Sequence, residues 1–83
     1  MRSAWGIGYR GAVLWFVLKK NGSFGYDRDV WWGDVLRFST SEQAESYYFF
    51  LCAKDTVPLC ERASVVKIKH WGTTVEVVDA MES

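Results

Sequence analysis

The sequence predicts an α+β fold, in which one helix packs on one face of a mainly antiparallel sheet of four to five strands. Short segments rich in β-branched and aromatic residues are separated by turn residues, and one segment has the periodicity of a helix instead. The chain contains no internal repeat or linker, and its 83 residues fit a single domain. The expected order of elements is βββαββ.

The N-terminal segment, residues 1–11, has the alternation of a short strand, with Trp5, Ile7 and Tyr9 spaced two apart. It also holds three glycines, and glycine weakens a strand because it loses more conformational freedom on folding than other residues. We therefore expect a loosely ordered edge strand here.

A hairpin is expected next. Residues 12–20 form the first firm strand, and the apolar run within it favours a central strand that is covered on both faces. Asn21 and Gly22 follow, a pair suited to the positive φ angles of a two-residue hairpin turn, so that residues 23–26 return antiparallel.

Residues 27–34 mix charged side chains with Trp31 and Trp32, which is typical of a loop whose rings fold back on the sheet. Residues 35–38 can add a short third strand. Further on, residues 63–71 alternate as a half-buried strand, Gly72 turns the chain, and residues 74–78 return as the last strand.

The helix is predicted over residues 41–53. Ser39 and Thr40 are each followed, three residues later, by Glu42 or Gln43, and either pair makes a capping box. Pro58 cannot continue a helix and ends the segment.

Four aromatic residues follow one another on this helix, and one core-facing stripe cannot take all of them. The core spacing i, i+3, i+4, i+7 selects Ala44, Tyr47, Tyr48 and Leu51. Phe49 then lies nearly opposite and Phe50 on the flank. These two rings need a cover, which is the protein's own tryptophan loop, a second subunit or a foreign surface.

Composition narrows the function classes. Ten basic residues balance ten acidic ones, which disfavours direct nucleic-acid binding, and 17% aromatic residues disfavour intrinsic disorder. The longest apolar run, residues 12–18, is shorter than the roughly 20 residues of a membrane span, and no signal-peptide pattern opens the chain. We expect no membrane association, a location in the cytoplasm of a bacterial host cell, and reduced Cys52 and Cys60.

Few residues in the sequence have the spacing of a catalytic or a metal-binding site. The two cysteines and His70 lack the close ligand spacing of a zinc site, and Asp27, Asp29 and Asp34 lack the pattern of a calcium loop. We expect no enzyme activity, no metal and no cofactor. A small enzyme with a carboxylate or Cys/His site remains an alternative, because such sites depend on proximity in space.

A single-stranded nucleic-acid binder is the first alternative. Lys67 and Lys69 project from one side of a predicted strand, and Trp31, Trp32 and Trp71 could stack on bases. The neutral charge and the absence of a recognisable nucleic-acid-binding motif argue against it.

Protein binding has the strongest support, because a small domain with this many aromatic residues exposes some of them, and tryptophan and tyrosine are common anchors of interfaces. Residues 16–51 resemble small proteins encoded by bacteriophages and other mobile elements, several anti-CRISPR proteins among them. The resemblance lies in the hairpin end KKNG (residues 19–22), in WWGD (residues 31–34) and in the strand-to-helix junction RFSTSEQAESY (residues 37–47).

Low net charge with many aromatic residues favours self-association, so a homodimer is a further expectation. The resemblance implies a stoichiometric inhibitor or adaptor that occludes a surface of a bacterial target protein, such as a CRISPR–Cas component. It assigns no role to any single residue. From the residues themselves, the aromatic and polar side chains that we expect at the contact are Trp31, Trp32, Phe49, Phe50, Arg28, Asp29, Asp34 and Glu45.

Overall fold

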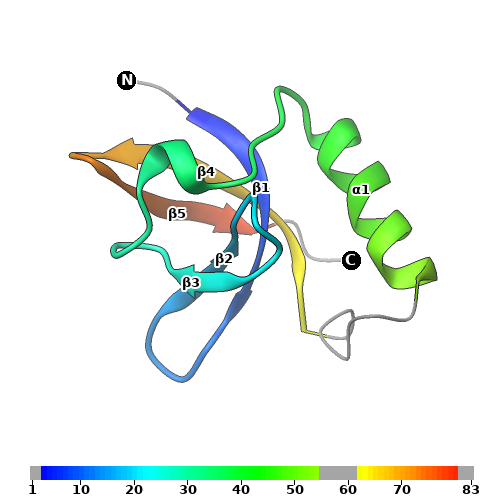
Figure 1. Ribbon diagram of the computed structural model, residues 1–83, viewed down its shortest axis with the longest axis horizontal. Coiled ribbons are helices and arrows are strands. Elements are labelled where there is room, and N and C mark those ends of the chain that lie inside the picture. Colours follow the sequence, from blue (N-terminus) through cyan, green and yellow to red (C-terminus); the bar gives the residue numbers. More distant parts are fainter. Residues whose placement is uncertain (1–2, 55–61, 81–83) are drawn as a thin grey trace.

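The computed structural model describes residues 3–54 and 62–80 and confirms the α+β fold with the order βββαββ. Five antiparallel strands form one sheet in the order β3-β2-β1-β4-β5, and one helix packs on it (Figure 1). The elements are β1 (Ser3–Arg10), β2 (Trp15–Leu18), β3 (Phe24–Tyr26), the 3-10 helix η1 (Trp32–Asp34), α1 (Ser41–Ala53), β4 (Ser64–Trp71) and β5 (Thr74–Ala80).

Strand β1 lies at the centre of the sheet, between β2 and β4, so the expectation of an edge strand was wrong for residues 3–10. The glycines that argued against a strand allow close packing instead. A Cβ atom on Gly8 would lie 2.5 Å from the carbonyl oxygen of Phe16 on β2, and one on Gly6 would lie 3.3 Å from the Ile68 side chain. Small residues are therefore required where β1 contacts its neighbours.

The β2–β3 hairpin forms where it was predicted, with Gly22 at φ +91°. The expected two-residue turn was wrong, because the Lys19 N–H donates to the Ser23 carbonyl at 2.8 Å and leaves three residues, 20–22, in the loop. Strand β2 is shorter than the expected 12–20, because Val13 and Leu14 lie in the β1–β2 connection with 80% and 44% of their surface exposed. Residues 35–38 do not form a regular strand. They make two isolated bridges instead, Val35 with Lys19 and Phe38 with Trp5.

The sheet curls until the segment after β3 lies beside β5. The carbonyl of Asp27 accepts a hydrogen bond from the Val75 N–H at 3.2 Å, and the Asp27 carboxylate accepts one from the Val77 N–H at 3.2 Å. The Trp32 N–H donates to the Thr73 carbonyl at 3.0 Å. These bonds satisfy backbone groups at the edge of β5 and close the sheet into a partial barrel.

Two clusters of apolar side chains hold the fold together. The first lies inside the curled sheet and consists of Val17, Val30, Trp32, Val35, Val66, Ile68 and Val75. The second lies between the outer face of the sheet and α1, where Ile7, Leu18 and Ala63 contact Tyr47, Tyr48 and Leu51 of the helix side. Side chains on the two faces of a strand thus pack into different cores, because successive side chains along a strand point to opposite faces of the sheet.

Helix α1 spans the predicted residues 41–53. Of the two predicted caps, the structure has the later one: the Thr40 hydroxyl accepts a hydrogen bond from the Gln43 N–H at 3.2 Å, and the Gln43 side chain accepts one from the Ser39 N–H at 3.1 Å. Ala44 is fully buried, which confirms the core face, while Phe49 and Phe50 stay exposed.

Cys52 is disulfide-bonded, so the expectation that it is reduced was wrong. The number and spacing of cysteines do not reveal whether the fold brings two thiols together, which is what decides bond formation. Cys60 and Pro58 lie outside the described residues.

Within the described part of the chain, no helix has the length and apolar character required to cross a membrane.

Candidate binding surfaces

Trp32, predicted at the contact, is a core residue. Only 7% of its surface is exposed, and its ring lies inside the curled sheet, stacked on His70 with 4.9 Å between ring centroids. Its neighbour Trp31 is 62% exposed. The tryptophan loop thus folds one ring onto the sheet, as expected, and leaves the other in solvent.

The other predicted residues of this loop lie at the surface. Arg28, Asp29 and Asp34 are exposed, with Asp34 at the end of η1. The side chain of Arg28 is hydrogen-bonded to β5, because its guanidinium donates to the Glu76 carboxylate at 2.5 Å. Together with Trp31 they form one group of predicted residues, which we call the loop group.

The second group lies on α1. Phe49 is 62% exposed and Phe50 49% exposed, and Glu45 is half-buried on the same helix. Each ring touches only its own helix among the described ring contacts: Phe49 lies 5.6 Å from the Tyr48 ring, Phe50 lies 5.8 Å from the Tyr47 ring, and the Lys54 ammonium lies 4.5 Å from Phe50. We call Phe49 and Phe50 the helix pair.

The loop group and the helix pair lie on different elements. Helix α1 covers part of the outer face of β1 and β4, whereas the loop before η1 is hydrogen-bonded to β5 (Figure 1). Both groups were expected in one contact. In the structure one group lies beside β5 and the other on α1, which packs on β1 and β4.

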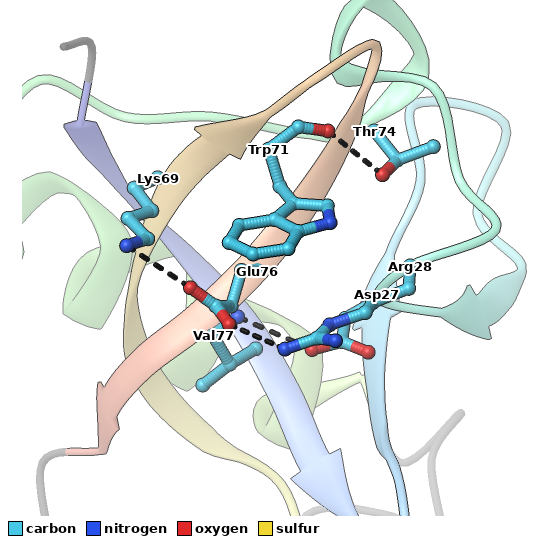
Figure 2. A network of polar contacts seen from close by, with 7 residues as sticks. All are labelled: Asp27, Arg28, Lys69, Trp71, Thr74, Glu76 and Val77. Atoms are coloured by element: carbon cyan, nitrogen blue, oxygen red, sulfur yellow. Dashed lines mark hydrogen bonds and ion pairs between the residues drawn. The ribbon is translucent and has the colours of Figure 1, made fainter.

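A polar network joins the loop group to β4 and β5, as Figure 2 shows. The Glu76 carboxylate accepts from both Arg28 and Lys69, the latter at 3.1 Å. The Arg28 guanidinium lies 4.7 Å from the centre of the Trp71 ring, and the Lys69 ammonium 5.7 Å from it. The hydrogen bond from Lys69, with a smaller contribution from Arg28, holds the pKa of Glu76 below its ordinary value.

The same outer face carries a second pair of this kind, which the sequence analysis did not predict. The Lys67 ammonium lies 5.8 Å from the Trp5 ring, across the β1–β4 pairing. The alternation of residues along β4 indicated that Lys67, Lys69 and Trp71 lie on one side of the strand. Their neighbour Trp5 could not be identified from the sequence, because the sequence does not reveal the pairing register of β1 and β4. Two pairs of a lysine and an indole ring therefore lie over β1 and β4.

A row of aromatic rings on β1, β2 and β3 was also not predicted. Tyr9 stacks on Phe16 at 4.8 Å between centroids, Phe24 meets Tyr9 edge-on at 5.1 Å, and Tyr26 lies 4.5 Å from Phe16. Phe24 and Tyr9 also pack against the core under α1. This row is chiefly an extension of that core, and only Tyr26, at 44%, is strongly exposed.

Two adjoining depressions lie where the chain passes from η1 into α1. One of about 470 Å³ is lined by residues that include Trp32, Lys20 and Arg37, and the other, of about 570 Å³, by residues that include Tyr47, Phe50 and Arg37. Arg37, Phe38 and Ser39 line both, and we call the combined feature the Arg37 groove. Phe50 of the helix pair lies at one end of it.

Metal-ligating side chains do not converge in the part of the chain that the structure describes: no group of three or more His, Cys, Asp or Glu residues that could hold a metal ion is found there.

No protein-family model matches the sequence, no curated protein is significantly similar to it, and no solved structure is significantly similar to the fold.

Proposed function

We propose that the protein is a non-catalytic protein-binding module, an inhibitor or adaptor that covers a surface of a bacterial target protein. The observation that supports this is the helix pair: Phe49 and Phe50 are 62% and 49% exposed on a helix whose other large rings are packed in the core. Large apolar side chains that stay exposed at adjacent positions of a helix are a feature of interaction sites.

The scaffold suits such a role. Tyr47, Tyr48 and Leu51 fix α1 on the sheet, so the helix pair is presented on a rigid element and little conformational entropy is lost when a partner binds. Phenylalanine adds contact area with only two side-chain torsions to restrict. Burying one such side chain completely contributes about 1.5–3 kcal/mol, so two partly buried rings can supply a useful share of a binding free energy.

The partner follows from the resemblance to anti-CRISPR proteins, which makes a CRISPR–Cas component the first target to test. A second copy of the chain, paired through the helix pair, is the competing occupant. The bacterial cytoplasm stays our expected location, although the disulfide at Cys52 is a bond that oxidising compartments favour. Thiol labelling of the protein in intact bacterial cells, before and after reduction, tests this location.

Capture from a bacterial lysate tests the proposal, with the wild type, an F49A/F50A double variant and a V13A/L14A control as baits. The control removes two exposed apolar side chains from the β1–β2 connection, away from α1. We expect a stoichiometric partner that the F49A/F50A bait loses and the V13A/L14A bait retains. The molar mass of each purified bait shows whether the helix pair makes a homodimer instead.

Single-stranded nucleic-acid binding remains a second candidate because of one observation, the two lysine–indole pairs on β1 and β4, Lys67 with Trp5 and Lys69 with Trp71. Partly open five-stranded barrels bind oligonucleotides in other proteins, an analogy at the level of the fold only. A titration with single-stranded oligonucleotides at two salt concentrations separates the candidates, since phosphate contacts weaken steeply with salt.

A further inference from the structure

The Arg37 groove contains buried hydrogen-bond donors that have no acceptor. Neither Trp32 Nε1 nor Arg37 Nε has a hydrogen-bond partner among the described residues, although both atoms are buried. An indole N–H and a guanidinium can only donate. Buried polar groups are satisfied in nearly all folded proteins, so these two residues, which line the groove, are the ones there that an added oxygen acceptor would favour.

Arg37 is held in place by stacking. Its guanidinium lies 4.8 Å from the centre of the Trp32 ring, and Trp32 is itself fixed by the inner core and by His70. On either side of Arg37 the backbone is bonded to the sheet, through Leu36 N–H to the Leu18 carbonyl at 3.0 Å and through Phe38 N–H to the Trp5 carbonyl at 2.7 Å. The guanidinium is thus pre-organised.

The charge of the groove is positive. Lys20 and Arg37 line it, no acidic residue lines either depression, and neither cation has an ion-pair partner within residues 3–54 and 62–80. A guanidinium without a counter-ion, beside an indole donor, matches the planar oxygen pair of a carboxylate. Phe38 and Phe50 add apolar walls.

We infer that the Arg37 groove binds an acidic side chain of the partner protein, with its carboxylate at Arg37 and an adjacent apolar side chain against Phe50. This inference rests on the proposed function and names the chemistry of the partner segment. A carboxylate on an apolar segment fits better than a phosphate backbone, because two cations beside aromatic walls on a neutral chain do not form the extended basic track that a backbone requires.

The dipeptide N-acetyl-Asp-Phe-amide is the probe that tests the inference, and N-acetyl-Asn-Phe-amide, which lacks only the charge, is its control. The readouts are the nitrogen-bound proton resonances of the Trp32 indole and of Arg37 Nε. We expect saturable shifts of both with the Asp dipeptide and binding weaker by about tenfold or more with the Asn dipeptide.

Variants locate the site. Arg37→Gln should abolish the response to the Asp dipeptide, Lys20→Gln should weaken it, and Arg10→Gln, an exposed position on β1, should leave it unchanged. Lys20 is exposed, so its variant keeps the test decisive if Arg37→Gln unfolds. Equal responses to the two dipeptides, or none, would overturn the inference, as would shifts caused by inorganic phosphate and not by the Asp dipeptide.

The two proposals can fail separately. If the F49A/F50A bait loses its partner but the Asp dipeptide does not bind, the helix pair is an interface and the Arg37 groove is not its acidic subsite. If the dipeptide binds and the wild-type bait captures no stoichiometric partner, the proposed function fails while the groove remains an anion site.

Discussion

The carboxylate of Asp27 accepts a hydrogen bond from the backbone N–H of Val77 at 3.2 Å, across fifty residues of sequence. Asp27 is only 6% exposed, and its backbone carbonyl accepts a hydrogen bond from the N–H of Val75, two residues before Val77 on β5. One residue after β3 therefore caps two N–H groups at the edge of β5. This pairing closes the curled sheet and protects an edge on which another strand could otherwise pair.

Asp27→Ala should destabilise the protein by about 1–3 kcal/mol, because it leaves the Val77 N–H without its acceptor. Asp27→Asn keeps an oxygen acceptor and should lose less. Asp29→Ala, at an exposed position in the same loop, is the control and should change little. Urea unfolding followed by circular dichroism measures all three, and equal midpoints for Asp27→Ala and the wild type would refute the capping role.

Gly8→Ala should cost about 1–3 kcal/mol through overpacking, since the new Cβ would lie 2.5 Å from the Phe16 carbonyl oxygen, a backbone atom that cannot move independently of β2. Gly33→Ala is a matched control, because a Cβ there meets nothing within 4 Å. Thermal unfolding of the two variants should separate them clearly. Similar melting temperatures would show that β1 and β2 do not pack as closely as described.

Thr40→Ala should destabilise the protein by about 1 kcal/mol, because the Thr40 hydroxyl accepts the Gln43 N–H at the start of α1. Ser39→Ala should have almost no effect, since the bond to the Gln43 side chain uses the Ser39 backbone N–H. Chemical unfolding of both variants distinguishes the two predicted capping pairs. A larger loss for Ser39→Ala would mean that the earlier pair caps the helix in solution.

Glu76 should make stability depend on pH in the acid range. Its pKa in the folded protein lies below the ordinary value of 4.5, chiefly because of the hydrogen bond from Lys69. The ion pairs therefore stabilise the fold fully above pH 4.5, and this contribution is lost as the pH falls through the folded pKa. Glu76→Gln should flatten the dependence of the unfolding midpoint on pH below this value, and an unchanged profile would contradict the assignment.

The helix could be predicted closely because its signals are local. Capping side chains and the i, i+3, i+4, i+7 spacing act within the segment itself, and they also separated the core residues Tyr47 and Tyr48 from the exposed Phe49. The central position of β1 could not be predicted. Its glycines matter through contact with β2, and contact between strands distant in sequence leaves no pattern in one strand alone.

The candidate surfaces were predictable only in part. Trp31 and Trp32 are adjacent in a loop without periodicity, so the sequence could not show that one is exposed and the other buried. Arg37 was assigned to a strand and had no predicted role. Its importance comes from stacking on Trp32 and from the lack of an acceptor for both side chains in the described structure, which only the fold reveals.

The affinity of the captured partner for the F49A/F50A variant tests the central claim most directly. Titration of the purified partner into wild type, F49A/F50A and V13A/L14A proteins of equal stability gives the three dissociation constants. If the helix pair is the anchor, F49A/F50A should bind about tenfold more weakly or worse, as expected for interface hot spots, and V13A/L14A should bind like the wild type. Equal dissociation constants for all three proteins would contradict the claim.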